Sequence, residues 1–222
     1  MLKQLPNALT LTRLILAPVI AWQMLDAVLS EIFRIYVREG GAPAFYSGIA
    51  DIWTLAATLF VVAALTDLFD GMIARALDAQ SKFGRIIDPI ADKALVGLPL
   101  IVVALCWNAF DPLRPVVLIA SAVIVIRDVL MTVIRFMSPD GEGARVSSLA
   151  KIKTALELVV VGSYLAATAI GAHVRVQASR EDPSAVLAAP FPDMLAYVWT
   201  ALLVVTAALS AYTALQYLRP KR

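Results

Sequence analysis

The sequence predicts an all-α integral membrane protein with six transmembrane helices and both termini in the cytoplasm. Of its 222 residues, 60% are hydrophobic and 16% are charged, whereas a soluble domain carries about 25% charged residues. The apolar residues are gathered into six runs, each close to the length of about 20 residues that crosses a bilayer. Backbone groups in hydrocarbon need partners within their own segment, so we expect each run to be a helix.

The six runs follow one another with short polar connections. In chain order they lie at Leu9–Leu29, Trp53–Ala76, Ile86–Ala109, Val116–Met137, Ile152–Ile170 and Met194–Tyr217. The first run is long for a signal peptide and lacks a clear cleavage site, so we expect a permanent span. The chain would then form one membrane domain over residues 1–222. Two longer outer loops are expected at residues 30–52 and 171–193, the second with His173 as a solvated side chain.

The distribution of basic residues predicts the orientation of the spans. If the N-terminus is cytoplasmic, twelve of the 19 Lys and Arg residues fall on the cytoplasmic side and five on the other. This excess predicts that both termini are cytoplasmic. The net charge of +2 gives no indication of nucleic-acid binding, and we expect no nucleic-acid partner.

Four aspartates lie where the second and third runs meet the predicted cytoplasmic edge, in the stretch DLFDGMIARALDAQSKFGRIIDPIADK. At about 100° per residue, two of them share one helical arc with two small residues. This arc holds Asp67, Asp70, Gly71 and Ala74. On the next helix, i,i+4 spacing stacks Gly84, Asp88 and Asp92 on one face. A turn between antiparallel helices would let the two faces meet.

Four converging carboxylates indicate a cation site. Like charges this close cannot all stay ionised without cations, and acids within a membrane mark function by default. All the candidate ligands are oxygens, which favours Mg²⁺, Mn²⁺ or Ca²⁺ over Zn²⁺. Two such ions would stabilise the attacking and leaving oxygens of a phosphoryl displacement. The alternative is that these acids pair with nearby basic residues, namely Arg75, Lys82, Arg85 and Lys93.

The spacing of these residues resembles the signature of the CDP-alcohol phosphatidyltransferase family. It reads Asp67-x-x-Asp70-Gly71-x-x-Ala74-Arg75, then eight residues, then Gly84-x-x-x-Asp88-x-x-x-Asp92. The resemblance implies six spans, a site that faces the cytoplasm, a homodimer and dependence on a divalent metal, most simply two Mg²⁺ (or Mn²⁺).

The resemblance also implies roles for the motif residues. The metal ligands would be Asp67, Asp70, Asp88 and Asp92, and Asp92 would be the base that deprotonates the acceptor hydroxyl. The cytidine diphosphate of the donor would be held by Asp67, Gly71, Ala74, Arg75 and Gly84.

A second group of basic residues indicates where a phosphorylated acceptor would bind. Arg127 and Arg135 lie two turns apart in the fourth run, and Lys151 and Lys153 begin the fifth. Arg127 is deep in an apolar run and needs an anion. Its neighbour Asp128 is expected to point to a different face, which leaves a substrate phosphate as the partner. The alternatives are a structural ion pair for Arg127, and for the lysines topology anchors or a Lys153–Glu157 pair.

Within the family, the stretches IRDVLMTVIR, AKIKTALE and LPNALTLTRLILAP resemble bacterial members that use glycerol 3-phosphate. This likeness implies CDP-diacylglycerol as donor and phosphatidylglycerol phosphate as product, in the inner membrane of a bacterium. Arg13 is expected either to contact an anion or to be a topology charge. Other acceptors stay open, namely phosphatidylglycerol, inositol phosphate or serine, and so does the remoter alternative of an ion or proton transporter.

Overall fold

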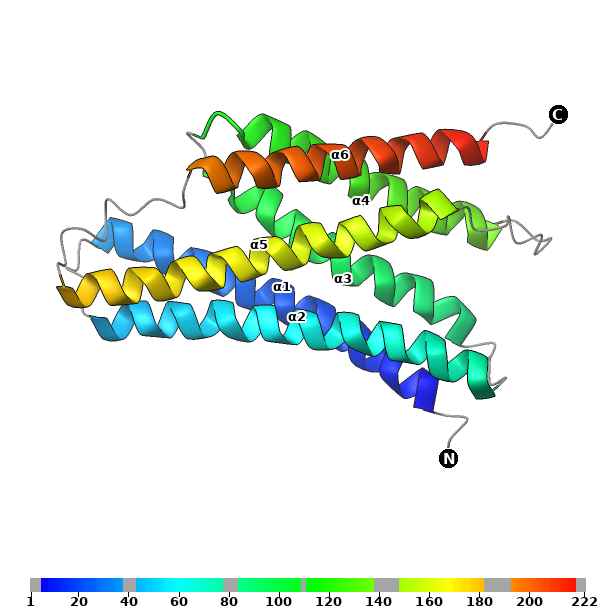
Figure 1. Cartoon of the computed structure of the whole chain (residues 1–222), viewed down its shortest axis with the longest axis horizontal. Coiled ribbons are helices and arrows are strands. Elements are labelled where there is room, and N and C mark those ends of the chain that lie inside the picture. The colour runs from blue at the N-terminus through cyan, green and yellow to red at the C-terminus, as the bar shows by residue number, and fades with distance from the viewer. Residues whose placement is uncertain are drawn as a thin grey trace.

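Within the residues that it describes, the computed structural model forms six helices that follow one another along the chain (Figure 1). It describes residues 5–37, 43–77, 84–108, 111–137, 148–181 and 193–218, with only the backbone described at 5–7, 34–37, 43–45, 68–77, 84–86, 135, 148, 150, 193–194 and 218. The helices are α1 (Leu5–Val37), α2 (Pro43–Leu77), α3 (Gly84–Cys106), α4 (Arg114–Met137), α5 (Ser148–Glu181) and α6 (Asp193–Leu218). All six are long and apolar enough to cross a membrane, which confirms the predicted fold class.

Successive helices run in opposite directions. The start of α1 and the end of α6 therefore lie at the same end of the bundle (Figure 1). We call this the terminal end. It also holds the last turns of α2 and α4 and the first turns of α3 and α5. An even number of spans requires that the two termini lie on the same side. That this terminal end faces the cytoplasm stays a prediction.

The predicted outer loops are helical in part, because residues 30–37, 43–52 and 171–181 belong to α1, α2 and α5. Helices α1, α2 and α5 have 33, 35 and 34 residues, so each is about 50 Å long at about 1.5 Å per residue. A bilayer core is about 30 Å thick. These three helices therefore extend beyond the others at the end opposite the termini (Figure 1). The predicted bounds of the loops at 30–52 and 171–193 were therefore too wide, because an apolar run records the thickness of the hydrocarbon and not the length of the helix.

Polar contacts join the extensions of α1, α2 and α5. Arg175 donates to Glu31 at 3.2 Å between Nη1 and Oε1, which ties α5 to α1. His173 lies on α5 and not in a loop, although its side chain is exposed as expected. Its Nε2 is 2.9 Å from Thr54 Oγ1, so it joins α5 to α2.

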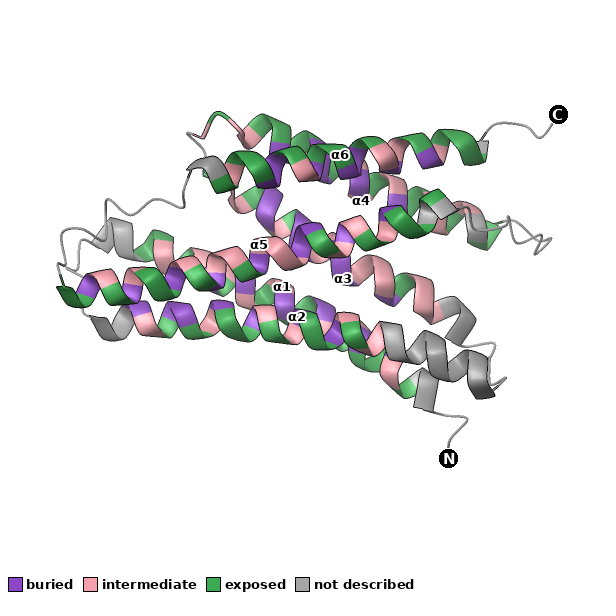
Figure 2. Ribbon diagram, in the orientation of Figure 1, coloured by how far each residue is buried: buried purple, intermediate pink, exposed green. Residues whose placement is uncertain are grey.

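The core is built from small residues where helices approach closely. Ala17 and Ala27 on α1, and Ala50, Ala56 and Ala63 on α2, are fully buried. Small side chains allow helix backbones to pack tightly within a membrane. Buried residues line the inner faces, and exposed residues cover the outside (Figure 2). Many exposed side chains are large and apolar, as expected for a surface in contact with lipid.

Helix α1 lies against both α2 and α3, while α2 and α3 touch each other only briefly. The other contacting pairs are α2 with α5, α3 with α4, α4 with α6, α5 with α6 and, less extensively, α3 with α5. The two acidic faces therefore meet through α1 more than through direct packing of α2 on α3.

Candidate active site

The first polar cluster at the terminal end is centred on Arg13 of α1. Its Nη1 donates to Asp67 of α2 and to Asp92 of α3, the latter at 2.5 Å from Oδ1. The Arg13 side chain is 2% exposed, whereas those of the two acids are 41% and 38% exposed. The buried Arg13 guanidinium thus neutralises two partly exposed carboxylates, one from α2 and one from α3. The anions that Arg13 contacts here are carboxylates of the protein, and its contact with a substrate anion stays a prediction.

Thr10 adds a second contact between α1 and the acids. Its hydroxyl donates to Asp88 Oδ1, and Thr10 itself is 2% exposed. Sequence reasoning missed this residue. The signal was present, because Thr10 and Arg13 are three residues apart and so share one face of α1.

The donor set fits a hard cation. Its atoms are carboxylate and hydroxyl oxygens, the ligands that Mg²⁺ prefers. Arg13 Nη1 lies between an oxygen of Asp67 and one of Asp92, so these two side chains can share a positive charge. Among the described side chains, no three Asp, Glu, His or Cys are close enough to hold one metal ion. Asp70, the fourth predicted ligand, lies outside the described side chains.

Of the residues predicted to contact cytidine diphosphate, Asp67 has a described side chain, and the others, like Asp70, are described only as backbone. Asp70, Gly71, Ala74 and Arg75 lie in the last two turns of α2, and Gly84 begins α3. Their roles stay predictions. The helix boundaries do place all of them at the terminal end, next to the three described acids.

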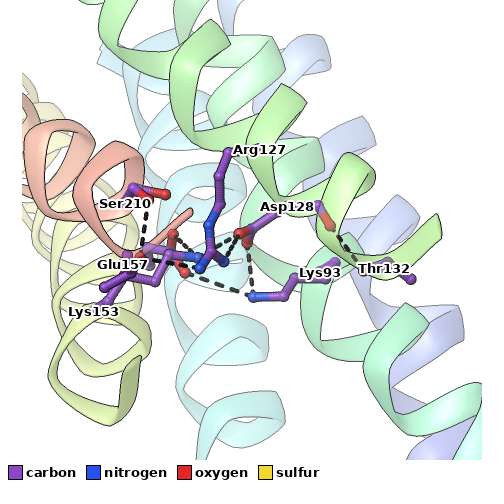
Figure 3. Close-up of polar contacts among 8 residues, drawn as sticks. Lys93, Arg127, Asp128, Thr132, Lys153, Glu157 and Ser210 are labelled. Atoms are coloured by element: carbon purple, nitrogen blue, oxygen red, sulfur yellow. Dashed lines mark hydrogen bonds and ion pairs between the residues drawn. The ribbon is translucent and has the colours of Figure 1, made fainter. Parts of the chain in front are cut away.

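The second polar cluster joins three helices around Asp128 (Figure 3). Asp128 Oδ2 accepts from Lys93 Nζ of α3 at 2.7 Å. Its Oδ1 accepts from Arg127 Nη1 of α4 at 2.8 Å and from Lys153 Nζ of α5. Glu157 pairs with Lys153 at 2.5 Å and lies 3.9 Å from Lys93. We call these five residues the cation cluster.

The cation cluster corrects one prediction. Asp128 was expected to be a poor partner for Arg127, because consecutive residues on a helix point about 100° apart. The long arginine side chain bends across this angle and reaches the carboxylate. The alternative of a structural ion pair for Arg127 is therefore the arrangement observed, as is the Lys153–Glu157 pair.

The predicted acceptor residues separate into different environments. Lys153 is 1% exposed inside the cation cluster, whereas Lys151 is exposed on the surface of α5. Arg127 is largely buried, and its Nη2 also donates to Thr213 Oγ1 of α6 at 3.0 Å. The side chain of Arg135 lies outside those described. Sequence reasoning had given no binding role to Lys93, Asp128 or Thr213.

The two clusters are adjacent along α3. Asp92 faces Arg13 of α1, and the next residue, Lys93, faces Asp128 of α4. A negatively charged cluster and a positively charged one therefore lie on neighbouring faces of a single helix.

A cavity of about 520 Å³ lies near the opposite end of the bundle. Its lining includes Trp53, Trp107, Tyr164 and Trp199 together with the Glu31–Arg175 pair. Trp107 and Trp199 stack at 5.5 Å between ring centroids. The lining contains no residue of the acidic motif or the cation cluster, so the cavity is separate from both.

Comparison with known proteins gives the family. The model of the CDP-alcohol phosphatidyltransferase family matches residues 3–218, nearly the whole chain. The chain belongs to this family. The predicted family is thereby confirmed, and the stretch that resembles its signature lies where Arg13 and Thr10 meet the described motif acids.

Several similar CDP-alcohol phosphatidyltransferases carry the name CDP-diacylglycerol–glycerol-3-phosphate 3-phosphatidyltransferase. The protein from Cereibacter sphaeroides is 33% identical over 158 residues, which are 71% of this chain and 61% of that protein. The chain therefore spans somewhat less than two thirds of this relative. The one from Rickettsia felis is 34% identical over 167 residues, 72% of this chain and 77% of that protein. The one from Wigglesworthia glossinidia brevipalpis is 32% identical, covering 72% and 76%.

Proposed function

We propose that this CDP-alcohol phosphatidyltransferase moves the phosphatidyl group of CDP-diacylglycerol to glycerol 3-phosphate, giving phosphatidylglycerol phosphate and CMP. The observation that carries the proposal is the position of two oppositely charged clusters on adjacent residues of α3. A carboxylate that accepts a proton and cations that bind a phosphate are both needed when the acceptor is a phosphorylated alcohol. The names of the similar proteins agree with this acceptor.

The reaction proposed is a single displacement. The Asp92 carboxylate takes the proton of the glycerol 3-phosphate hydroxyl, and the oxygen attacks the phosphorus that bears the diacylglycerol. The bond from this phosphorus to the CMP oxygen breaks, and CMP leaves. The acceptor's own phosphate does not react, and its binding by the cation cluster fixes the hydroxyl in position.

The acids of the motif would hold a divalent metal, most simply two Mg²⁺ or Mn²⁺, with Asp67, Asp70, Asp88 and Asp92 as ligands. Such ions neutralise charge on the phosphoryl oxygens. Arg13 would assist by keeping the Asp67 and Asp92 carboxylates together. We further propose a homodimer in a bacterial inner membrane, with the terminal end and its two clusters facing the cytoplasm.

Release of CMP by the purified protein tests this function. The assay contains CDP-diacylglycerol, Mg²⁺ and one acceptor at a time: glycerol 3-phosphate, phosphatidylglycerol, serine or inositol phosphate. We expect release with glycerol 3-phosphate. Release with another acceptor alone would overturn the acceptor assignment and keep the acidic site.

A matched pair of variants on α2 tests the site itself. Asp67→Asn should abolish CMP release, because it removes a carboxylate of the motif. Asp51→Asn lies on the same helix at the opposite end, where Asp51 is exposed, and should keep full activity. Equal activity in the two variants would show that the acidic site is wrongly assigned.

A further inference from the structure

The cation cluster carries more positive than negative charge. Three cations, Lys93, Arg127 and Lys153, face two carboxylates, Asp128 and Glu157 (Figure 3). One positive charge is therefore in excess. The Lys153 and Glu157 side chains are 1% and 0% exposed, and charge inside a membrane protein is costly without a partner. The cluster is therefore suited to take up one more anion.

Asp128 occupies the centre of this cluster. All three cations contact its carboxylate, two at Oδ1 and one at Oδ2. Three cations arranged around one compact anion also form a binding site for a phosphate, which offers more oxygens and more charge. Asp128 thus lies where the phosphate of an acceptor would make its contacts.

The contact between Arg127 and Asp128 is one that a phosphate can improve. Arg127 uses a single nitrogen, Nη1, for the carboxylate. Its Nε is buried and has no hydrogen-bond partner among the described residues. A guanidinium binds phosphate best through two parallel N–H groups. Nε and Nη2 form one such fork, and Nη2 already donates to Thr213 Oγ1 at 3.0 Å. A phosphate oxygen at Nε would therefore add a hydrogen bond that the Asp128 carboxylate does not make.

The other members of the cluster keep partners if Asp128 releases them. Lys153 keeps Glu157 at 2.5 Å. Lys93 contacts the other oxygen of Asp128, so the carboxylate retains a cation of its own. An exchange of Asp128 for a phosphate therefore leaves no charge in the cluster without a partner.

We propose that Asp128 is a built-in competitor of the acceptor's phosphate. In the unliganded protein its carboxylate binds Arg127 and Lys153, and the phosphate of glycerol 3-phosphate displaces it from both while Lys93 retains it. This inference rests on the proposed function for the identity of the acceptor. It makes Asp128 a specificity-determining residue, because an acceptor without a phosphate cannot displace the carboxylate from two cations.

Removing the charge of Asp128 tests the competition. For Asp128→Asn we expect a KM for glycerol 3-phosphate that is lower by roughly tenfold, about the effect of one hydrogen bond between charged groups. Inorganic phosphate should also raise the Tm of this variant more than that of the wild type. A residue that merely positioned the cations would give the opposite result, a higher KM and a weaker effect of phosphate.

Two controls separate the charge from the local packing. Asp128→Glu restores a carboxylate and should bring the KM back from the value of Asp128→Asn toward that of the wild type. Thr132→Val removes the hydroxyl that donates to the backbone carbonyl of Asp128 at 2.8 Å and leaves the carboxylate in place, so its KM should also be unchanged.

A charge-balanced variant covers the case in which Asp128→Asn does not fold. The double variant Lys93→Met/Asp128→Asn removes one cation and one anion, so the cluster keeps its single excess positive charge. It should still show the lower KM and the larger phosphate shift. An unchanged or higher KM in either folded variant overturns the proposal.

The wild-type assay separates this inference from the proposed function. If the wild type releases no CMP with glycerol 3-phosphate, the proposed acceptor is wrong. The Tm shifts with inorganic phosphate then still test whether Asp128 competes with phosphate, because they do not depend on turnover. A larger shift in Asp128→Asn than in the wild type supports the proposal, and an equal or smaller shift overturns it.

Discussion

Lys151 and Lys153 look equivalent in the sequence, and the structure predicts that they differ sharply in their effect on stability. The variant Lys153→Met replaces the lysine by a side chain of similar length, so the packing at this position is kept while the positive charge is lost. The Lys153 side chain is 1% exposed and pairs with Asp128 and Glu157. Its removal leaves Glu157 with Lys93, at 3.9 Å, as its nearest cation among the described side chains. Breaking a buried pair in this way costs about 3 kcal/mol, which corresponds to a fall in Tm of about 6–12 °C for a chain of this size.

Thermal unfolding of the protein in detergent measures this difference. Lys151→Met is the matched control, because Lys151 is exposed on the same helix and surface substitutions change stability little. The double variant Lys153→Met/Glu157→Met should regain most of the lost Tm, since replacing both buried charges by apolar groups is often neutral or stabilising. Equal Tm values for the two single variants would refute the buried position of Lys153.

Three further predictions concern α1 and the core. Arg13→Gln leaves two carboxylates without their shared cation, so Mg²⁺ should raise the Tm of this variant more than that of the wild type; an equal rise in a Mg²⁺ titration would contradict it. Thr10→Val should lower kcat roughly tenfold by removing a hydrogen bond to a motif carboxylate, whereas Thr12→Val, on an exposed part of the same helix, should not, and equal rates would exclude a role for the hydroxyl. Gly162→Leu should cost about 1–3 kcal/mol by overpacking, because a Cβ there lies 3.3 Å from Phe60 Cε1; an unchanged midpoint in thermal unfolding would count against this packing.

The number and type of the helices could be predicted from the sequence because lipid imposes a strong constraint. An apolar run of about 20 residues has few alternatives to a spanning helix. The ends of the helices could not be predicted in the same way. Beyond the hydrocarbon, α1 and α5 continue through polar residues, where contacts such as Glu31–Arg175 replace lipid as the source of stability.

The acidic motif could be predicted because helical spacing fixes which residues share a face. Its partners on α1 were harder to predict, since spacing within one helix does not say which other helix packs against it. Asp128 was missed for a related reason. Helical geometry fixes the direction of the Cα–Cβ bond, but the four rotatable bonds of Arg127 let its nitrogen reach a neighbour that starts on another face.

The position of α3 between the two clusters explains why one helix can serve both halves of the proposed reaction. Consecutive residues on a helix point about 100° apart, so Asp92 faces α1 and Lys93 faces α4. The base and the acceptor-phosphate site are then fixed relative to each other by a single rigid backbone. A rotation of α3 about its axis would therefore move Asp92 relative to α1 and Lys93 relative to α4 at the same time. Substitutions in the α3–α4 contact, such as enlargement at Gly97, where an added Cβ lies 4.0 Å from Val125 Cγ2, are therefore expected to change kcat and the KM for the acceptor together. A change in KM alone, at constant kcat, would show that the two clusters are positioned independently.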